Sequence, residues 1–283
     1  MPAPPLLSFC SFISPNTTFE QDVQLATKWG FAGLGVGEAK LDGGPSSDDR
    51  RVRLLRDSGL RASACVPYTI SPLPLDPAGQ FSPEKDLDKR LEDLRASVQR
   101  LAAFEPHSVI VTTGKAPWLP ASEQRALAVE GLREAARVAA QNGTRISVEA
   151  LRLPQYTDVR TLPEAIELIE EIDEPNVDMA YDIWHLWDQP DLISLTTRHA
   201  RRIGAVHVSD WLARPGVRPT DRGFAGEGVA NVAEILAALE RGGFSGWYDV
   251  EVFSSTFETM PPDDIFQHSR ESWNRTWNAA MEL

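Results

Sequence analysis

A (β/α)₈ barrel is the fold class that this sequence predicts. Short apolar runs alternate with longer amphipathic stretches through eight repeats in a chain of 283 residues. Such alternation requires a parallel sheet, because parallel neighbours need a crossover connection, and a typical barrel takes about 250 residues. No linker or low-complexity segment interrupts the pattern. We therefore expect a single domain over residues 1–283.

The alternative for eight such units is an open doubly wound sheet. Its commonest nucleotide-binding forms carry G-x-G-x-x-G after the first strand, or G-x-x-x-x-G-K-[ST]. Neither motif occurs in this chain, which favours the closed barrel. Strands are expected at 6–12, 31–36, 60–66, 108–113, 145–149, 177–181, 202–208 and 247–253, and helices at 17–29, 47–58, 82–104, 123–141, 161–172, 191–200, 232–241 and 263–280.

Capping and turn residues mark the ends of these elements. Thr17-x-x-Glu20 and Thr161-x-x-Glu164 have the pattern of a capping box, and Ser82-Pro83 places a proline where a helix begins. The proline-rich segment 67–83 predicts a long loop. Glycines are expected to end helices at Gly30, Gly59, Gly143 and Gly242.

The composition indicates a globular protein that does not bind nucleic acid. Hydrophobic residues make up 42% of the chain, and the net charge is −13, whereas phosphate backbones are bound by Lys and Arg. Both cysteines, Cys10 and Cys65, lie in apolar runs and are expected to be buried free thiols. Residues 1–12 lack the pattern of a signal peptide, and no apolar run reaches membrane-spanning length. We expect a cytoplasmic enzyme or binding protein without a membrane partner.

Four successive predicted strands carry a carboxylate or an imidazole at or near their ends. Charged side chains are rarely buried in apolar strands unless they are paired or bound to metal. Since the carboxyl ends of barrel strands form the active-site face, these four groups should converge, and a divalent cation would remove their mutual repulsion. The four residues are Glu149, Asp182, His207 and Glu251.

Each of these residues alone has an ordinary structural explanation. A rim glutamate could form an ion pair, His207 could be a hydrogen-bonded core histidine, and Asp182 could cap the helix that follows it. Their occurrence on four consecutive strands favours a joint metal site. A set with three carboxylates, one histidine and no cysteine suits one Mn²⁺, Mg²⁺, Co²⁺ or Zn²⁺ ion used for Lewis-acid chemistry.

These segments resemble a known family. Ser147-Val148-Glu149, Tyr181-Asp182-Ile183-Trp184-His185, Val206-His207-Val208-Ser209-Asp210 and Val250-Glu251-Val252 are similar to motifs of the xylose-isomerase-like barrels, in particular their sugar phosphate isomerase/epimerase branch. Gly226-Glu227-Gly228-Val229 adds to this resemblance. The resemblance implies one metal, with Mn²⁺ favoured, held by the four residues, and a carbohydrate-like small molecule as substrate. Homo-oligomers would be usual for such a family.

The resemblance also implies catalytic and substrate-binding residues. Glu149 and Glu251 would exchange protons on opposite faces of the reacting carbon through an enediolate, and His185 would orient the substrate or a ligand. The loop after the seventh strand offers Arg214, Arg218 and Arg222 as substrate clamps, and spacing favours Arg218.

Position 155 departs from the epimerase pattern. Ketose epimerases of this kind carry a substrate-binding glutamate there, and this chain has Gln155, which makes free-ketose 3-epimerisation doubtful. Of the aromatic residues near the expected strand ends and loops, one or two should line the site, and Trp118 is chosen among them. The others are Phe9, Tyr68, Trp184 and Trp211.

The function expected is a metal-dependent isomerase or epimerase of a sugar, sugar acid or polyol-derived keto compound. The alternative is a lyase or dehydratase on the same site, resembling inosose or dehydroshikimate dehydratases or cleaving a keto-glycoside. An endonuclease IV-like repair enzyme is disfavoured because its three-metal cluster needs further histidines and this chain has five in all. A non-catalytic binding protein is the remaining alternative.

Overall fold

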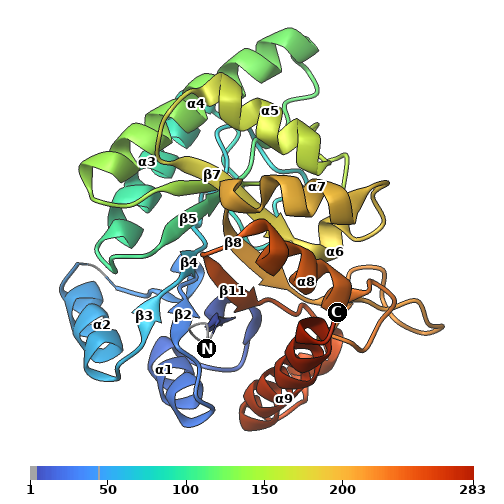
Figure 1. Ribbon diagram of the computed structural model, residues 1–283. Helices are drawn as coiled ribbons and strands as arrows, with labels where there is room; N and C mark the ends of the chain where they lie inside the picture. The colour runs from blue at the N-terminus through green and yellow to red at the C-terminus, as the bar shows by residue number, and fades with distance from the viewer. Residues whose placement is uncertain (1–4, 44) are drawn as a thin grey trace.

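The computed structural model describes residues 5–43 and 45–283, and it has the predicted barrel architecture (Figure 1). Residues 1–4, which belong to the segment without a predicted signal peptide, lie outside this description together with residue 44. One parallel sheet runs in the order β3-β2-β1-β11-β8-β7-β6-β5-β4. Only Ser63 separates β3 from β4, so the two ends of this order belong to one continuous segment and the barrel closes there. The expected (β/α)₈ barrel is confirmed.

The barrel strands coincide with the predicted apolar runs and are mostly shorter, except that β7 extends one residue beyond its predicted end to include Asp182. They are β1 (Leu6–Cys10), β2 (Gly33–Gly35), β3 (Arg61–Ala62), β4 (Ala64–Cys65), β5 (Ser108–Val111), β6 (Ile146–Glu149), β7 (Val177–Asp182), β8 (Ile203–Val208) and β11 (Trp247–Val250). The main helices are α1 (Phe19–Lys28), α2 (Pro45–Asp57), α3 (Leu87–Ala102), α4 (Ala121–Gln141), α5 (Leu162–Ile172), α7 (Leu192–His199), α8 (Val232–Gly242) and α9 (Pro262–Met281). The sequence did not predict the one-turn helix α6 (Ile183–Leu186) or the small antiparallel pair β9 (Asp210–Trp211) and β10 (Arg222–Gly223).

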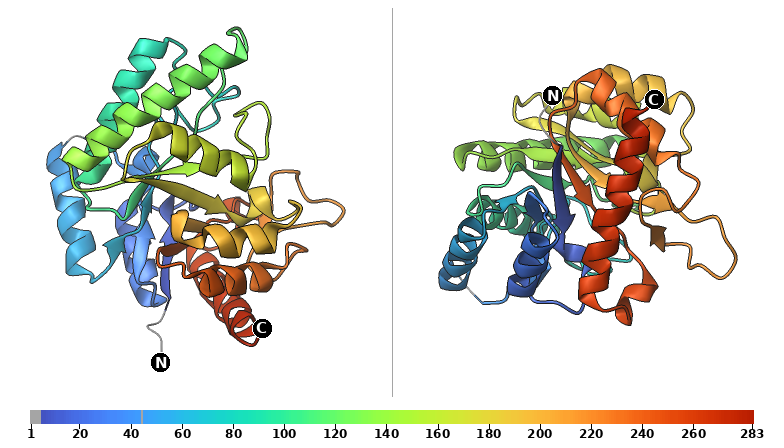
Figure 2. Two further views of the ribbon diagram at one scale, coloured as in Figure 1. Left: turned by 45° about the horizontal axis from the view of Figure 1, so that its top comes forward. Right: turned by 60° about the horizontal axis from the view of Figure 1, so that its bottom comes forward.

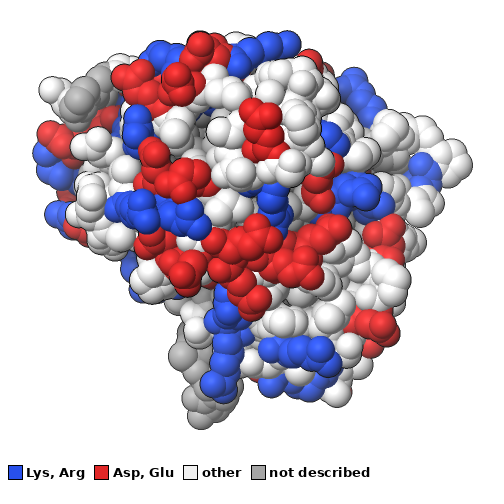
Figure 3. All heavy atoms as spheres, turned by 90° about the horizontal axis from the view of Figure 1, so that it is seen from above, with Lys and Arg blue, Asp and Glu red and all other residues white. Residues whose placement is uncertain are grey.

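Helix α9 completes the ring of helices around the strands. Figure 2 shows it along the outside of the barrel, where it packs against α8 and also touches α1. Across the outer helices the charges of both signs are interspersed on the face in Figure 3. Ion pairs join neighbouring helices, with Arg95 2.8 Å from Glu134 and Arg125 2.9 Å from Glu171. No helix in the described ranges combines the length and apolarity that a membrane crossing needs.

One of the two capping boxes is confirmed, the other shifts by one residue, and one of the four glycine stops shifts by one residue, whereas Gly30, Gly59 and Gly143 have the expected positive φ. The box at Thr161 and Glu164 is present. The first box is formed by Thr18 and Gln21 rather than Thr17 and Glu20, because the Thr17 hydroxyl donates instead to Asp22 at 2.5 Å. The helix stop expected at Gly242 is made by Gly243, whose φ of 81° places it in the left-handed region.

Helix α3 begins at Leu87, with Asp86 as its cap, and not at Ser82-Pro83. The physical reason is Arg90, whose side chain is fully buried. Its guanidinium donates hydrogen bonds to carbonyl groups that would otherwise accept from amides within a helix at that place. Its Nη1 donates to the carbonyls of Ser82 at 3.1 Å and Glu84 at 2.9 Å, and its Nε donates to those of Ser71 and Leu73, both at 2.9 Å. Arg90 therefore holds the long loop between β4 and α3 through main-chain atoms, and this loop covers part of the barrel mouth.

Replacing Arg90 by Met should destabilise the protein by about 2–4 kcal/mol, because several buried carbonyl groups lose their donor. Chemical denaturation would measure the free energy of unfolding. Arg95→Met, on an exposed face of the same helix, is the matched control and should cost under about 1 kcal/mol. Equal effects of the two substitutions would show that Arg90 does not hold the loop.

Candidate active site

The four residues predicted to converge do so at the carboxyl ends of four adjacent strands. Glu149 and Asp182 are the last residues of β6 and β7, His207 lies in β8, and Glu251 directly follows β11. One side-chain oxygen or nitrogen of each lies within 4.8 Å of those of the others, and all four side chains are buried. Register explains the convergence, since Asp182 pairs with His207 across the sheet and the Glu251 amide donates to the carbonyl of Val208.

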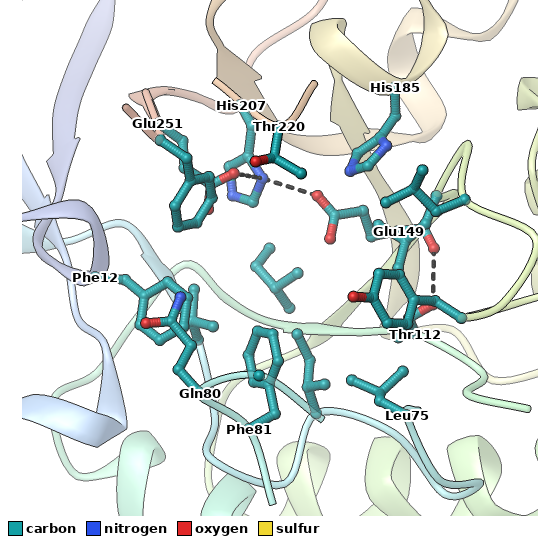
Figure 4. A pocket seen from close by; sticks show the side chains of 18 of the residues that line it. Phe12, Leu75, Gln80, Phe81, Thr112, Glu149, His185, His207, Thr220 and Glu251 are labelled. Atoms are coloured by element: carbon teal, nitrogen blue, oxygen red, sulfur yellow. Dashed lines mark hydrogen bonds and ion pairs between the residues drawn. The ribbon is translucent and has the colours of Figure 1, made fainter. Parts of the chain in front are cut away.

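His207 lies between the two glutamates (Figure 4). Its Nδ1 is 2.9 Å from Oε1 of Glu149 and 3.3 Å from Oε2 of Glu251. Burial opposes a charge on the ring, but Glu251 and Glu149 outweigh it and raise the pKa of His207 to about 10. The imidazolium therefore supplies positive charge where the carboxylates converge.

Asp182 has two partners, one for each oxygen. Its Oδ1 accepts a hydrogen bond from the Trp184 amide at 2.7 Å, so it does cap α6, and its Oδ2 accepts one from Nη1 of Arg222 at 2.8 Å. Burial acts to raise the pKa of Asp182, but the charge of Arg222 and the neighbouring histidines outweigh it and lower that pKa. The lowered pKa favours an ionised Asp182, and its capping of α6 leaves it within the cluster of the four residues.

The pKa of Glu149 is shifted in the opposite direction. Burial raises its pKa, and the hydrogen bond from His207 offsets only part of that effect. A carboxyl group with a raised pKa beside one with a lowered pKa is the arrangement that lets one group carry a proton while the other stays charged. Glu149 is the group suited to proton transfer.

Three carboxylates and one imidazole form a donor set that fits a divalent metal ion. Oxygen ligands with one histidine suit Mn²⁺, Mg²⁺ or Zn²⁺, and the closeness of their ligand atoms permits one shared ion. The only positive charges that contact the three carboxylates are those of Arg222 and protonated His207 among the described residues. If a divalent ion replaced the proton on His207, the carboxylates would still neutralise its charge. A divalent metal is therefore the ligand that this chemistry suggests.

Arg222 reaches the cluster because the loop after β8 folds back on itself. β10 pairs antiparallel with β9, and the amide of Arg222 donates to the carbonyl of Phe253 at 2.6 Å. Its Nη1 donates to Asp182 and, at 2.9 Å, to Oε2 of Glu251. The Cζ atom of Arg222 lies 4.9 Å from the ring centroid of Trp184 and 4.7 Å from that of Phe253. These two rings restrict the position of the guanidinium.

Asp210 organises the rest of this loop and explains the glycine motif. Its carboxylate accepts hydrogen bonds from the amides of Gly226 at 3.0 Å and Ala230 at 2.9 Å. A Cβ at Gly228 would lie 2.2 Å from the carbonyl oxygen of Trp211 and 2.4 Å from Asp210, so only glycine fits there.

The structure brings some of the other expected residues into the cavity and leaves others outside. His185 lines it, and its Nδ1 accepts a hydrogen bond from the Arg152 amide at 3.1 Å, which leaves the Nε2 hydrogen for a ligand. Burial lowers the pKa of His185 to about 3, so the ring is neutral. Gln155 is exposed, and Trp118 is 57% exposed and outside the cavity lining.

Among the three arginines considered, Arg222 occupies the place that spacing suggested for Arg218. Arg214 and Arg218 are exposed on the loop that projects from the barrel in Figure 2, and Arg218 lies 3.8 Å from Glu258. Residue spacing alone does not show that β9 and β10 pair and thereby return Arg222 to the four clustered residues. The cavity, about 480 Å³, is also lined by Phe12, Phe81, Tyr156 and Phe253, which the sequence analysis did not select.

Residues 23–276 match the family described as xylose isomerase-like TIM barrel, and the chain belongs to that family. The chain is 25% identical to an L-ribulose 3-epimerase of a Methylomonas species, over 81% of this chain and 76% of that protein. An inosose isomerase of Halalkalibacterium halodurans is 25% identical over 53% of this chain and 54% of its own length, and an inosose dehydratase of Geobacillus thermodenitrificans is 28% identical over 46% and 47%. These last two matches therefore span about half of each relative. Among solved structures, the IOLI protein with a binding zinc atom has the same fold, with a TM-score of 0.81 and 19% identity over 98% of this chain and 99% of that one.

Metal affinity should rise with pH. His207 carries a proton below its pKa of about 10, and a metal bound at Nδ1 must displace that proton, so each lower pH unit disfavours binding. Between pH 6 and 8 the apparent affinity for Mn²⁺ or Zn²⁺ should increase about tenfold per unit. Chelator competition would measure it.

His185→Gln is the control for this prediction, because His185 is already neutral across that range and its loss should leave the slope unchanged. A pH-independent affinity in the unsubstituted protein would contradict the role assigned to His207.

Proposed function

We propose that this protein is a divalent-metal-dependent isomerase or epimerase of polyhydroxy carbonyl compounds. The observation that carries the proposal is the buried cluster of Glu149, Asp182, His207 and Glu251, which opens into a cavity through both glutamates. The names of its relatives, an epimerase and an isomerase of polyhydroxy ketones, support the same class. Mn²⁺ is the ion that we expect first.

A divalent ion bound by these residues would neutralise the carboxylates and polarise the substrate carbonyl. Proton transfer is assigned to the chain itself. Glu149 and Glu251 flank His207 from two sides, so a substrate carbon above the ring has one carboxylate towards each face. One glutamate removes the proton next to the carbonyl, and the other returns a proton from the opposite side, which inverts that carbon.

Arg222 and His185 are suited to hold the oxygen atoms of the intermediate. Removal of the proton leaves an enediolate, whose negative charge needs hydrogen-bond donors already in position. The guanidinium of Arg222 lies against Glu251, and Nε2 of His185 lies 3.7 Å from Oδ2 of Asp182, so both donors lie at the edge of the cluster that Glu149, Asp182, His207 and Glu251 form. They stabilise the charge that develops during the reaction.

A lyase acting on the same site is the second candidate. An enediolate with a leaving group on the next carbon can expel it instead of regaining a proton, and one relative is named an inosose dehydratase. The exposed position of Gln155 favours this alternative to free-ketose epimerisation, because the side chain does not reach a substrate in the cavity. Product mass separates the two, since isomerisation conserves it and elimination lowers it.

Substituting Glu149 or Glu251 by Gln should lower the rate of solvent deuterium incorporation next to the substrate carbonyl by about 10²–10⁴-fold, because an amide cannot carry the proton. Mass spectrometry of an inosose or ketose substrate in D₂O measures the exchange, and metal content is determined in parallel. The exposed Glu258→Gln variant is the control and should retain full exchange. Unchanged exchange in both active-site variants would remove these glutamates from the mechanism.

Arg222 and Arg218 can be distinguished by a matched pair of substitutions. Arg222→Lys should reduce kcat/KM by about 10- to 100-fold, because the compact ammonium lacks the planar guanidinium that donates in fixed directions to Asp182 and Glu251 and packs against Trp184 and Phe253. Arg218→Lys should change it less than about twofold, since Arg218 is exposed. A larger loss in the Arg218 variant would restore the residue favoured by sequence spacing.

A further inference from the structure

The cavity beside the cluster of Glu149, Asp182, His207 and Glu251 has two chemically different ends. Its polar end is formed by Glu149, His185, His207, Arg222 and Glu251. The opposite end is mainly apolar, and Figure 4 shows Phe12, Phe81 and Leu75 across the cavity from the carboxylates, with the exposed Gln80 beside the two rings. A small sugar held at the polar end would leave the apolar end unfilled.

The apolar end is an organised cluster of aromatic rings. Phe12 stacks on Phe81 with centroids 5.3 Å apart and meets Phe253 edge to face at 5.9 Å. These rings come from three separate places, namely the segment after β1, the loop before α3 and the segment after β11. Phe81 and Phe253 are only half-buried, so part of each ring borders the cavity.

Many main-chain groups of the covering loop already have partners. The carbonyls of Ser71, Leu73 and Ser82 accept from Arg90, the amide of Leu73 donates to Thr113, and the amide of Phe81 donates to the carbonyl of Ala78. The Gln80 amide at the edge of this end can accept or donate one hydrogen bond, but hydroxyl groups placed against Phe12, Phe81 and Phe253 would lose water without a new partner, which costs free energy. A hydrocarbon surface would instead gain from burial.

We propose that the substrate carries an aromatic or branched hydrocarbon substituent that binds against Phe12, Phe81 and Phe253. The polyhydroxy carbonyl part of the same substrate lies at the cluster of Glu149, Asp182, His207 and Glu251. The inference rests on the proposed function and names the substrate class for that site. The cavity volume of about 480 Å³ agrees with it, because pockets of roughly 300–1,000 Å³ enclose ligands larger than a single sugar. The substituent is part of the same molecule, since both ends belong to one continuous cavity.

A matched pair of probes tests the substituent directly. Phenyl and methyl 3-keto-β-D-glucopyranosides share the same α-hydroxy ketone and differ in the group on the glycosidic oxygen. Phenoxide also leaves more easily than methoxide, which affects kcat, so the comparison is made on KM. With Mn²⁺-loaded protein in D₂O, the KM for deuterium incorporation beside the carbonyl should be about 10- to 100-fold lower for the phenyl compound. Equal values, or a preference for the methyl compound, would overturn the inference while leaving the proposed function in place.

The Phe81→Ser variant assigns that preference to the aromatic end. It should remove most of the phenyl preference, measured as the ratio of the KM values of the two compounds. Leu127→Ala, an exposed position on α4, is the control and should keep the preference. A phenyl preference that survives in Phe81→Ser and in Phe253→Ser would place the substituent elsewhere and overturn the assignment.

A binding measurement separates failure of the inference from failure of the proposed function. Calorimetry with the unoxidised phenyl and methyl β-D-glucopyranosides needs no turnover. If neither keto compound exchanges deuterium, the proposed function fails for this class, and tighter binding of the phenyl glucoside still supports the apolar subsite. Equal binding of the two glucosides would overturn it.

Discussion

Electrostatic repulsion among three carboxylates is the constraint around which the mouth of this barrel is built. Glu149, Asp182 and Glu251 are held close together by the ends of rigid parallel strands and cannot separate without distorting the sheet. Positive charge must therefore come to them. The raised pKa of His207, the reach of Arg222 and the suitability of the donor set for a dication are three responses to this one requirement.

The same cluster distributes charge unequally. Asp182 receives a helix amide and a guanidinium and stays ionised, whereas burial pushes Glu149 towards its protonated form. Both residues follow apolar strands of similar composition, so the difference arises from the groups that surround them. This asymmetry lets one carboxylate serve mainly to bind and another to exchange protons.

The parts of the site on barrel strands could be predicted from the sequence, as could His185 three residues after Asp182, whereas most parts that depend on the folding of the connecting segments could not. Glu149, Asp182, His207 and Glu251 were recognisable because a charged or ionisable residue in an apolar run is costly, and because barrel topology brings strand ends together. Arg222 and Phe81 reach the cavity through chain reversals that depend on long-range contacts, such as the pairing of β9 with β10 and the bonds of Arg90. Similarly, the start of α3 was misplaced because a tertiary contact from Arg90 competes with the local helix signal at Ser82-Pro83.

The way in which Arg90 holds the covering loop has a consequence for how this protein can change. Its guanidinium binds mainly carbonyl groups, and every amino acid carries one. The path of the loop is thus specified by a residue outside it, largely independently of the side chains that the loop presents to the cavity. Substitutions at positions such as 75 or 81 can alter which molecules fit while the loop keeps its shape and the cluster of Glu149, Asp182, His207 and Glu251 keeps its geometry. The fold in this way assigns the shape of the cavity and its acidic cluster to separate parts of the chain.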